Sequence, residues 1–116
     1  MIARLVGSEM CIRDRSYQST KALIDKYDLD AFIGLTRGPA WKINYDGGDY
    51  VAIKNTIEFG NGGYAAHNGM PHITIPYFEI NKFPVGISII GDRWTDKIII
   101  GYASAIEKSR YNFDTQ

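Results

Sequence analysis

The positions of the apolar residues predict a helix near each end of the chain. In residues 16–27 they recur at steps of three and four, which places one side of a helix against a core. The residues on this side are Tyr17, Thr20, Leu23, Ile24 and Tyr27. A second series predicts a helix over residues 96–108, with Ile98, Ile99, Tyr102, Ala103 and Ile106 on one side. We expect Thr95 to cap this second helix and Trp94 to pack on Ile99 as a hydrophobic staple.

Three short apolar runs predict strands between these helices. Residues 31–35 are continuously apolar, which is typical of a strand covered on both faces. Residues 72–76 and 84–90 are separated by turn-forming residues, so an antiparallel hairpin turning near Asn81 is expected. A short helix over about 64–68, closed by Gly69, is expected before the hairpin. This order predicts an α/β fold with a mixed β-sheet flanked by helices.

Composition and charge argue against several classes of protein. Of the 13 basic and 13 acidic residues, three basic and two acidic ones lie in residues 1–15, so the remainder is close to neutral. A neutral balance gives no electrostatic reason to bind nucleic acid or an anionic membrane. No apolar run approaches the roughly 20 residues that a membrane span needs. We expect a soluble chain with the cytoplasm as its default compartment, and with no disulfide framework, since Cys11 is the one cysteine.

The polar motifs lack the partners that a cofactor or metal site requires. Asp46 and Asp49 lie in a glycine-containing turn cluster without the run of oxygen donors that calcium needs, so a solvated turn is predicted. The glycine-rich bend at 59–63 has neither the spacing of a dinucleotide fingerprint nor the Lys-Ser/Thr ending of a P-loop. No cofactor is therefore predicted.

Two histidines and one serine are the remaining candidates for chemistry. His67 and His72 have no cysteine or close carboxylate pair to complete a zinc site, so both are interpreted as ordinary polar or packed histidines. Ser88 is followed by Ile89 and Ile90 rather than by the glycine of a nucleophile elbow, so it is interpreted as a strand residue. No catalytic residue and no metal ligand is predicted in this chain.

Residues 5–15 read Leu-Val-Gly-Ser-Glu-Met-Cys-Ile-Arg-Asp-Arg and resemble a translated sequencing-library adapter. The alternative is a secretory signal, which needs an uninterrupted apolar region of roughly 7–15 residues. Gly7, Glu9 and Arg13 interrupt any such region. We expect residues 1–15 to be an adapter-derived artefact with few long-range contacts. Residues 16–116 are then one small domain or the C-terminal portion of a larger one.

Three segments of residues 16–116 resemble the C-terminal part of the amidase signature family. The first runs from Leu29-Asp30-Ala31-Phe32-Ile33 to Gly38-Pro39-Ala40-Trp41, the second is Gly69-Met70-Pro71-His72-Ile73-Thr74-Ile75-Pro76, and the third is Phe83-Pro84-Val85-Gly86-Ile87-Ser88-Ile89-Ile90-Gly91. Each segment is weak alone, but the three occur in the family's order and spacing. The Gly-Pro-Ala-Trp form resembles the stand-alone amidase and peptide-amidase branch.

The resemblance implies the C-terminal fragment of an amide hydrolase whose catalytic residues all lie upstream. That family uses a Ser nucleophile, a second Ser in a cis peptide and a Lys base, because a hydroxyl at its normal pKa needs a neighbouring base. This chain contains no Ser-Ser pair. The resemblance places Trp41 at the substrate pocket, whereas the residues alone leave a core aromatic open. The implied partner of the full-length parent is a small amide or peptide amide, and the exposed apolar surface of the fragment is expected to self-associate.

Departures from the family pattern leave the substrate and the exact function open. Leu35-Thr36 stands where the family often has Pro before Thr, residues 60–63 replace a Ser-rich turn, and Tyr77-Phe78 occupies a region where Gly is usual. One alternative is a small stand-alone binding or structural domain of amidase-like ancestry. Another is a fragment of a glutamyl-tRNA amidotransferase A-type subunit.

Overall fold

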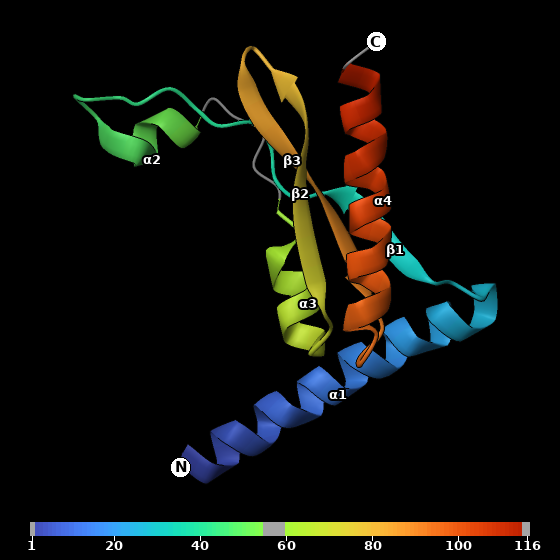
Figure 1. The fold of residues 1–116 in the computed structure, drawn as a ribbon. Helices are drawn as coiled ribbons and strands as arrows, with labels where there is room; N and C mark the ends of the chain where they lie inside the picture. Colours follow the sequence, from blue (N-terminus) through green and yellow to red (C-terminus); the bar gives the residue numbers. More distant parts are fainter. Residues whose placement is uncertain (1, 55–59, 115–116) are drawn as a thin grey trace.

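The computed structural model describes the backbone of residues 2–54 and 60–114 and the side chains of residues 15–54 and 60–110. The elements, in chain order, are α1 (Ile2–Tyr27), β1 (Ala31–Leu35), α2 (Gly48–Ile53), α3 (Gly62–Asn68), β2 (His72–Ile80), β3 (Phe83–Gly91) and α4 (Asp96–Asp114). Helix α4 runs beside the β2–β3 hairpin, α1 crosses one end of it, and α2 projects to one side (Figure 1). This combination of helices and a sheet confirms the α/β class.

The three strands form one sheet in the order β1-β3-β2, with both pairings antiparallel. Ile33 of β1 lies opposite Ile89 of β3, and Thr74 of β2 lies opposite Ser88. Since β1 and β2 are both antiparallel to β3, they run parallel to one another with β3 between them, a split βαβ arrangement. The expected hairpin is confirmed. The expected mixed pairing does not occur among these strands, because β3 separates the two that run parallel.

The hairpin turn has the backbone geometry that its position demands. Asn81 and Lys82 have φ angles of 53° and 68°, so both central residues are left-handed, as in a type I′ turn. This turn type matches the right-handed twist of the two strands it joins. Further along β2, the register shifts between Pro76 and Phe78. This bulge and the proline lie on an edge strand, where a missing N–H donor is tolerated.

The sheet separates two hydrophobic clusters. On one face Ile24, Ala65, Met70 and Ile90 pack together, with Tyr17 and Phe32 against them. On the other face Ile75, Ile89, Ile99 and Ala103 pack together, with partly buried neighbours from β1, β2, β3 and α4. Ile89 and Ile90 contribute to opposite clusters because successive side chains of a strand point to opposite faces. Strand β3 therefore supplies the centre of both clusters.

Several apolar residues predicted to face inward are exposed instead. Ile33 and Leu35 of β1 are exposed, with 64% of the Ile33 surface accessible, so β1 is not covered on both faces. Helix α4 packs on β2 and β3, which leaves this face of the edge strand β1 open. On the helices, Leu23, Tyr27, Ile98 and Tyr102 are also exposed, and the buried stripes are narrower than predicted.

The start of α4 differs from its expected form in one respect. Trp94 has a φ of 68° and is 94% exposed, so the predicted staple on Ile99 is wrong. Thr95 does precede the helix, and its carbonyl accepts from the N–H groups of Ile98 and Ile99. Its hydroxyl donates to the carbonyl of Asp92 at 2.6 Å. Because the backbone of Trp94 is left-handed, the chain cannot approach the helix in the extended conformation that a hydrophobic staple requires.

Helix α1 begins at Ile2, before the start at about residue 16 that the apolar pattern predicts. The expectation that Ile2, Val6 and Ile12 stay out of the core lies outside the described side chains. Within the described residues, no helix has the length and apolar character needed to cross a membrane.

The contact between the end of β3 and α4 predicts opposite effects for two glycine substitutions. A Cβ at Gly91 would lie 2.5 Å from both Ile99 Cγ2 and Thr95 Oγ1, whereas a Cβ at Gly101 in α4 meets nothing within 4 Å. We expect Gly91→Ala to lower the free energy of unfolding by about 1–3 kcal/mol through overpacking. Gly101→Ala should raise it by about 0.5–1 kcal/mol, because glycine disfavours a helix interior. Urea unfolding measures both, and equal stability of the two variants would contradict the described packing.

Candidate functional site

The loop that leaves β1 places Trp41 beside a hollow. Trp41 is half-buried, and neither described hydrophobic cluster includes it. Its Nε1 donates to Asp49 Oδ1 at 3.3 Å, and the Arg37 guanidinium carbon lies 5.2 Å from the ring centroid, within cation–π range. The hollow has a volume of about 480 Å³ and is lined by Trp41, Lys42, Ile43, Asn44, Tyr45, Asp46, Val51 and Ala52. This volume suits a small molecule, while the role of Trp41 in binding substrate stays a prediction.

Of the two acidic residues near this hollow, Asp46 lies in the turn before α2, whereas Asp49 lies in the first turn of α2, so the predicted turn is correct for Asp46 alone. Asn44 Oδ1 accepts from the backbone N–H groups of Asp46, at 3.1 Å, and Gly47, at 2.8 Å. Asp46 and Asp49 are exposed, and Asp49 accepts the hydrogen bond from the Trp41 indole. In the part of the chain that the structure describes, no group of three His, Cys, Asp or Glu residues is placed to hold a metal ion.

Three side chains form a hydrogen-bonded relay across the sheet. Thr36, just after β1, has its Oγ1 2.7 Å from Ser88 Oγ on β3. Ser88 Oγ lies 2.7 Å from His72 Nε2 at the start of β2, and Thr74 Oγ1 is 3.4 Å from the same nitrogen. The pairing of Thr74 with Ser88 puts His72 diagonally across from Ser88, within reach of a side chain on the same face. We call Thr36, Ser88 and His72 the hydroxyl relay.

The relay resembles a nucleophile beside its base, but its serine is closed to solvent. A serine hydroxyl bonded to an imidazole nitrogen is the pairing that activates nucleophiles. Ser88 is only 1% exposed, and no carboxylate among the described residues bonds to the His72 ring. In this arrangement Ser88 cannot attack a bound molecule. We therefore interpret the relay as a structural contact that joins β2, β3 and the residue that follows β1. His67 takes no part in it and lies exposed on α3.

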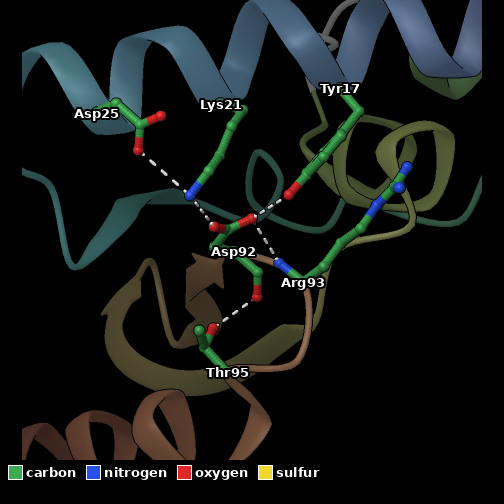
Figure 2. A network of polar contacts seen from close by, with 6 residues as sticks. All are labelled: Tyr17, Lys21, Asp25, Asp92, Arg93 and Thr95. Atoms are coloured by element: carbon green, nitrogen blue, oxygen red, sulfur yellow. Dashed lines mark hydrogen bonds and ion pairs between the residues drawn. The ribbon is translucent and has the colours of Figure 1, made fainter.

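A second polar network joins α1 to the end of β3 (Figure 2). Tyr17 OH donates to Asp92 Oδ1 at 2.7 Å, and Lys21 Nζ donates to Asp92 Oδ2 at 2.8 Å. Lys21 also lies 3.2 Å from Asp25, one helical turn further along α1. The backbone N–H of Arg93 donates to Asp92 Oδ1 at 2.7 Å. One carboxylate thus fixes α1 against the turn between β3 and α4.

The proton affinities in this network follow from its hydrogen bonds. The bond to Asp92 raises the pKa of Tyr17, and burial and the negative charge of the carboxylate add to the rise. The bonds to Asp92 and Asp25 raise the pKa of Lys21. Burial alone would raise the pKa of Asp92, but the hydrogen bonds from Lys21 and Tyr17 outweigh it, and the net pKa is lowered. At neutral pH Asp92 and Lys21 are both charged.

Arg93 extends the same network to α3. Its guanidinium carbon lies 3.6 Å from the Tyr17 ring centroid, and its Nε donates to the backbone carbonyl of Asn68 at 3.0 Å. Asn68 is fully buried, and neither its Oδ1 nor its Nδ2 has a hydrogen-bond partner among the described residues. Arg93 therefore links α1, α3 and the turn before α4.

The sequence correctly predicts Ser88 in a strand and His72 at a strand start, whereas the role of Trp41 stays a prediction and neither polar network was predicted. The relay could have been found by combining the predicted hairpin with the alternation of side chains, since His72, Thr74 and Ser88 share one face. Thr36 and the Asp92 network have no such signal, because their partners are distant in sequence.

Comparison with family models, curated protein sequences and solved structures gave no match.

The Asp92 network predicts a pH-dependent contribution to stability. Asp92→Asn should lower the free energy of unfolding at pH 7 by about 1.5–3 kcal/mol, the range for hydrogen bonds to a charged group. Asp25→Asn is the matched control, because Asp25 is 65% exposed, and surface pairs contribute about 1 kcal/mol or less. Since the folded-state pKa of Asp92 is lowered, its contribution is complete above the ordinary aspartate pKa of about 4. It is lost as pH falls through the lowered value.

Urea unfolding of the parent chain and both variants, from pH 7 down to pH 2.5, measures this contribution. The difference between the parent and Asp92→Asn should shrink as the solution becomes more acid. A constant difference over this range would contradict a charged Asp92 in the folded protein.

Proposed function

We propose that this chain is the C-terminal part of an amide hydrolase of the amidase signature type, with its nucleophile and base supplied by upstream residues. The observation that carries the proposal is the placement of the three resembling segments. One leads through β1 into the Trp41 loop, one enters β2, and one is β3. Segments separated in sequence thus adjoin in a single sheet, as parts of one site would.

Incomplete burial supports a larger parent domain. On β1, Ile33 is 64% exposed and Leu35 is 39% exposed, although Ala31 on the same face packs against the cluster that α4 covers. An upstream part of the parent that packs on β1 would bury this apolar surface.

The hollow at Trp41 is the proposed substrate side of the site. Its lining combines Trp41 with the apolar side chains of Ile43, Val51 and Ala52 and with the polar residues Lys42, Asn44, Tyr45 and Asp46. Aromatic and aliphatic walls with a few polar groups are typical of small-molecule sites. The proposed ligand in the parent is a small amide or peptide amide, with its acyl or aryl portion against Trp41.

The proposal assigns no catalytic residue to this chain. The Ser88–His72 pair supports this assignment, because the Ser88 hydroxyl is buried and both of its neighbours in the relay are protein side chains. The activated nucleophile, its base and the oxyanion-stabilising groups would all come from upstream, where the amidase signature family carries them.

The coding DNA immediately upstream of Ser16 provides the test of this function. We expect an uninterrupted reading frame that encodes a Gly/Ser-rich stretch with a Ser-Ser pair and an upstream Lys. A start codon with a ribosome-binding site directly before Ser16 would contradict the proposal. That result would indicate instead a small stand-alone domain.

The chain by itself is expected to hydrolyse no amide above the rate in buffer, because residues 15–54 and 60–110 hold no accessible activated nucleophile. A panel of aryl and peptide amides measures this, with Ser88→Ala and His72→Ala as matched variants. Turnover by the repurified, unsubstituted chain that is lost in Ser88→Ala or His72→Ala would refute the assignment of this chain as a fragment.

The uncovered apolar surface predicts self-association. Exposed apolar patches and an edge strand without charged residues favour contacts between copies. Sedimentation velocity at micromolar concentration should show dimers or larger species, and Ile33→Lys should shift the distribution toward monomer. The matched control is Ile43→Lys, in the loop away from the sheet. If the unsubstituted chain stays monomeric at these concentrations, that result would contradict the proposal that upstream residues cover this apolar surface.

A further inference from the structure

We propose that Thr36, Ser88 and His72 are positioning residues, which together hold the loop that carries Trp41 in a fixed place at the end of β1. The inference rests on the proposed function only in naming the loop as the substrate side. The hydrogen bonds themselves, and their effect on Trp41, belong to this chain alone.

The relay can run in either direction, because each direction provides an acceptor for two of its three hydrogens. If the Thr36 hydroxyl donates to Ser88 Oγ, and Ser88 donates to His72 Nε2, both hydroxyl hydrogens find acceptors within the relay. In the opposite direction His72 Nε2–H would donate to Ser88 and Ser88 to Thr36. The Thr36 hydrogen would then have no acceptor among the hydrogen bonds described. The first direction places the His72 ring proton on Nδ1, where it likewise has no acceptor among the hydrogen bonds described. Both directions therefore keep Thr36, Ser88 and His72 connected.

Packing around the relay restricts how these side chains can move. Ser88 is 1% exposed, and a buried hydroxyl left without a partner is costly. A Cβ at Gly86 would lie 2.9 Å from Thr74 Cγ2 and 3.2 Å from Thr36 Oγ1, so glycine leaves just enough room for the Thr36 hydroxyl to reach Ser88. The side chain of Thr36 is therefore held by its bond and by its neighbours.

Thr36 passes this constraint to the loop. Its backbone N–H donates to the carbonyl of Gly86 at 2.9 Å, and its own carbonyl accepts from the N–H of Asn61 at 3.0 Å. The next residue, Arg37, forms a bridge with Gly60, and its guanidinium lies over the Trp41 ring. A continuous path of contacts thus runs from His72 through Ser88 and Thr36 to Arg37 and Trp41.

This path gives the relay a defined role in the proposed substrate site. Thr36, Ser88 and His72 do not touch the hollow at Trp41, so none of them contacts a ligand there. Their effect is to fix the angle at which the loop leaves the sheet. In the full-length parent, loss of the relay would weaken substrate binding and raise KM more than it would lower kcat, because a displaced wall affects binding before chemistry.

Fluorescence of Trp41 in the full chain tests the proposal directly. Trp94→Phe leaves Trp41 as the single tryptophan and provides the background for two substitutions at Thr36. Thr36→Val keeps the shape of the side chain and removes the hydroxyl, whereas Thr36→Ser keeps the hydroxyl. We expect the acrylamide quenching constant of Trp41 to rise about twofold in Thr36→Val, because a lost hydrogen bond shifts a local equilibrium several-fold. Thr36→Ser should match the background.

Far-UV circular dichroism establishes that each variant is folded before quenching is compared. Quenching of Trp41 that is unchanged in both folded Thr36→Val and folded Thr36→Ser would overturn the proposal. A rise of equal size in both variants would also overturn it, because the effect would then come from packing rather than from the hydroxyl.

Nitrogen-15 NMR of the histidines in the unsubstituted chain is a second measurement, and it does not depend on any variant folding. His67 is exposed and serves as the internal reference for a solvated ring. We expect Nε2 of His72 to show the signal of a nitrogen hydrogen-bonded to a buried hydroxyl, distinct from the ring nitrogens of His67. A His72 Nε2 signal that matches the solvated ring of His67 would overturn the relay. Neither readout requires amide hydrolysis, so failure of the relay and failure of the proposed function are distinguishable.

Discussion

Strand β3 is bonded on both sides, and this constraint organises the whole described structure. Its pairing with β1 and β2 fixes which residues face each side of the sheet. Ile89 then points to the cluster that α4 covers, while Ser88 and Ile90 point to the opposite face. A shift of one residue in either register would exchange these faces. The apolar packing and the polar relay therefore depend on the same backbone alignment.

The two polar networks occupy different ends of this arrangement and do different work. At the end of β3, the Asp92 carboxylate holds α1 through charged hydrogen bonds that span more than 70 residues of sequence. On the face of the sheet, the hydroxyl relay is uncharged at Thr36 and Ser88 and ends at a histidine. The first network determines where a helix docks. The second is the one that lies next to the proposed substrate side.

The sequence correctly predicts secondary-structure elements that follow from a local pattern of residues. It does not predict the exposure or the contacts of side chains that depend on residues distant in sequence. Strands 31–35, 72–76 and 84–90, the hairpin near Asn81 and the short helix closed by Gly69 follow from periodicity and turn chemistry. The exposure of Ile33 and Ile98 does not, because it depends on where α4 crosses the sheet. The Trp94 staple fails since a left-handed backbone overrides the usual capping geometry. Trp41 was singled out by its motif, and its role stays a prediction, whereas Thr36 and Asp92 acquire partners only through the fold.

The central proposal is that the loop carrying Trp41, at the end of this sheet, forms the substrate side of a larger amide hydrolase. A crystal structure of the protein translated from the contiguous reading frame, with an amide-analogue inhibitor bound, tests it most directly. The account predicts that an upstream Ser-Ser-Lys group faces the loop of residues 36–41, that the inhibitor contacts Trp41, and that Ile33 is buried by upstream residues. An inhibitor bound away from Trp41, with Ile33 still exposed to solvent, would contradict it.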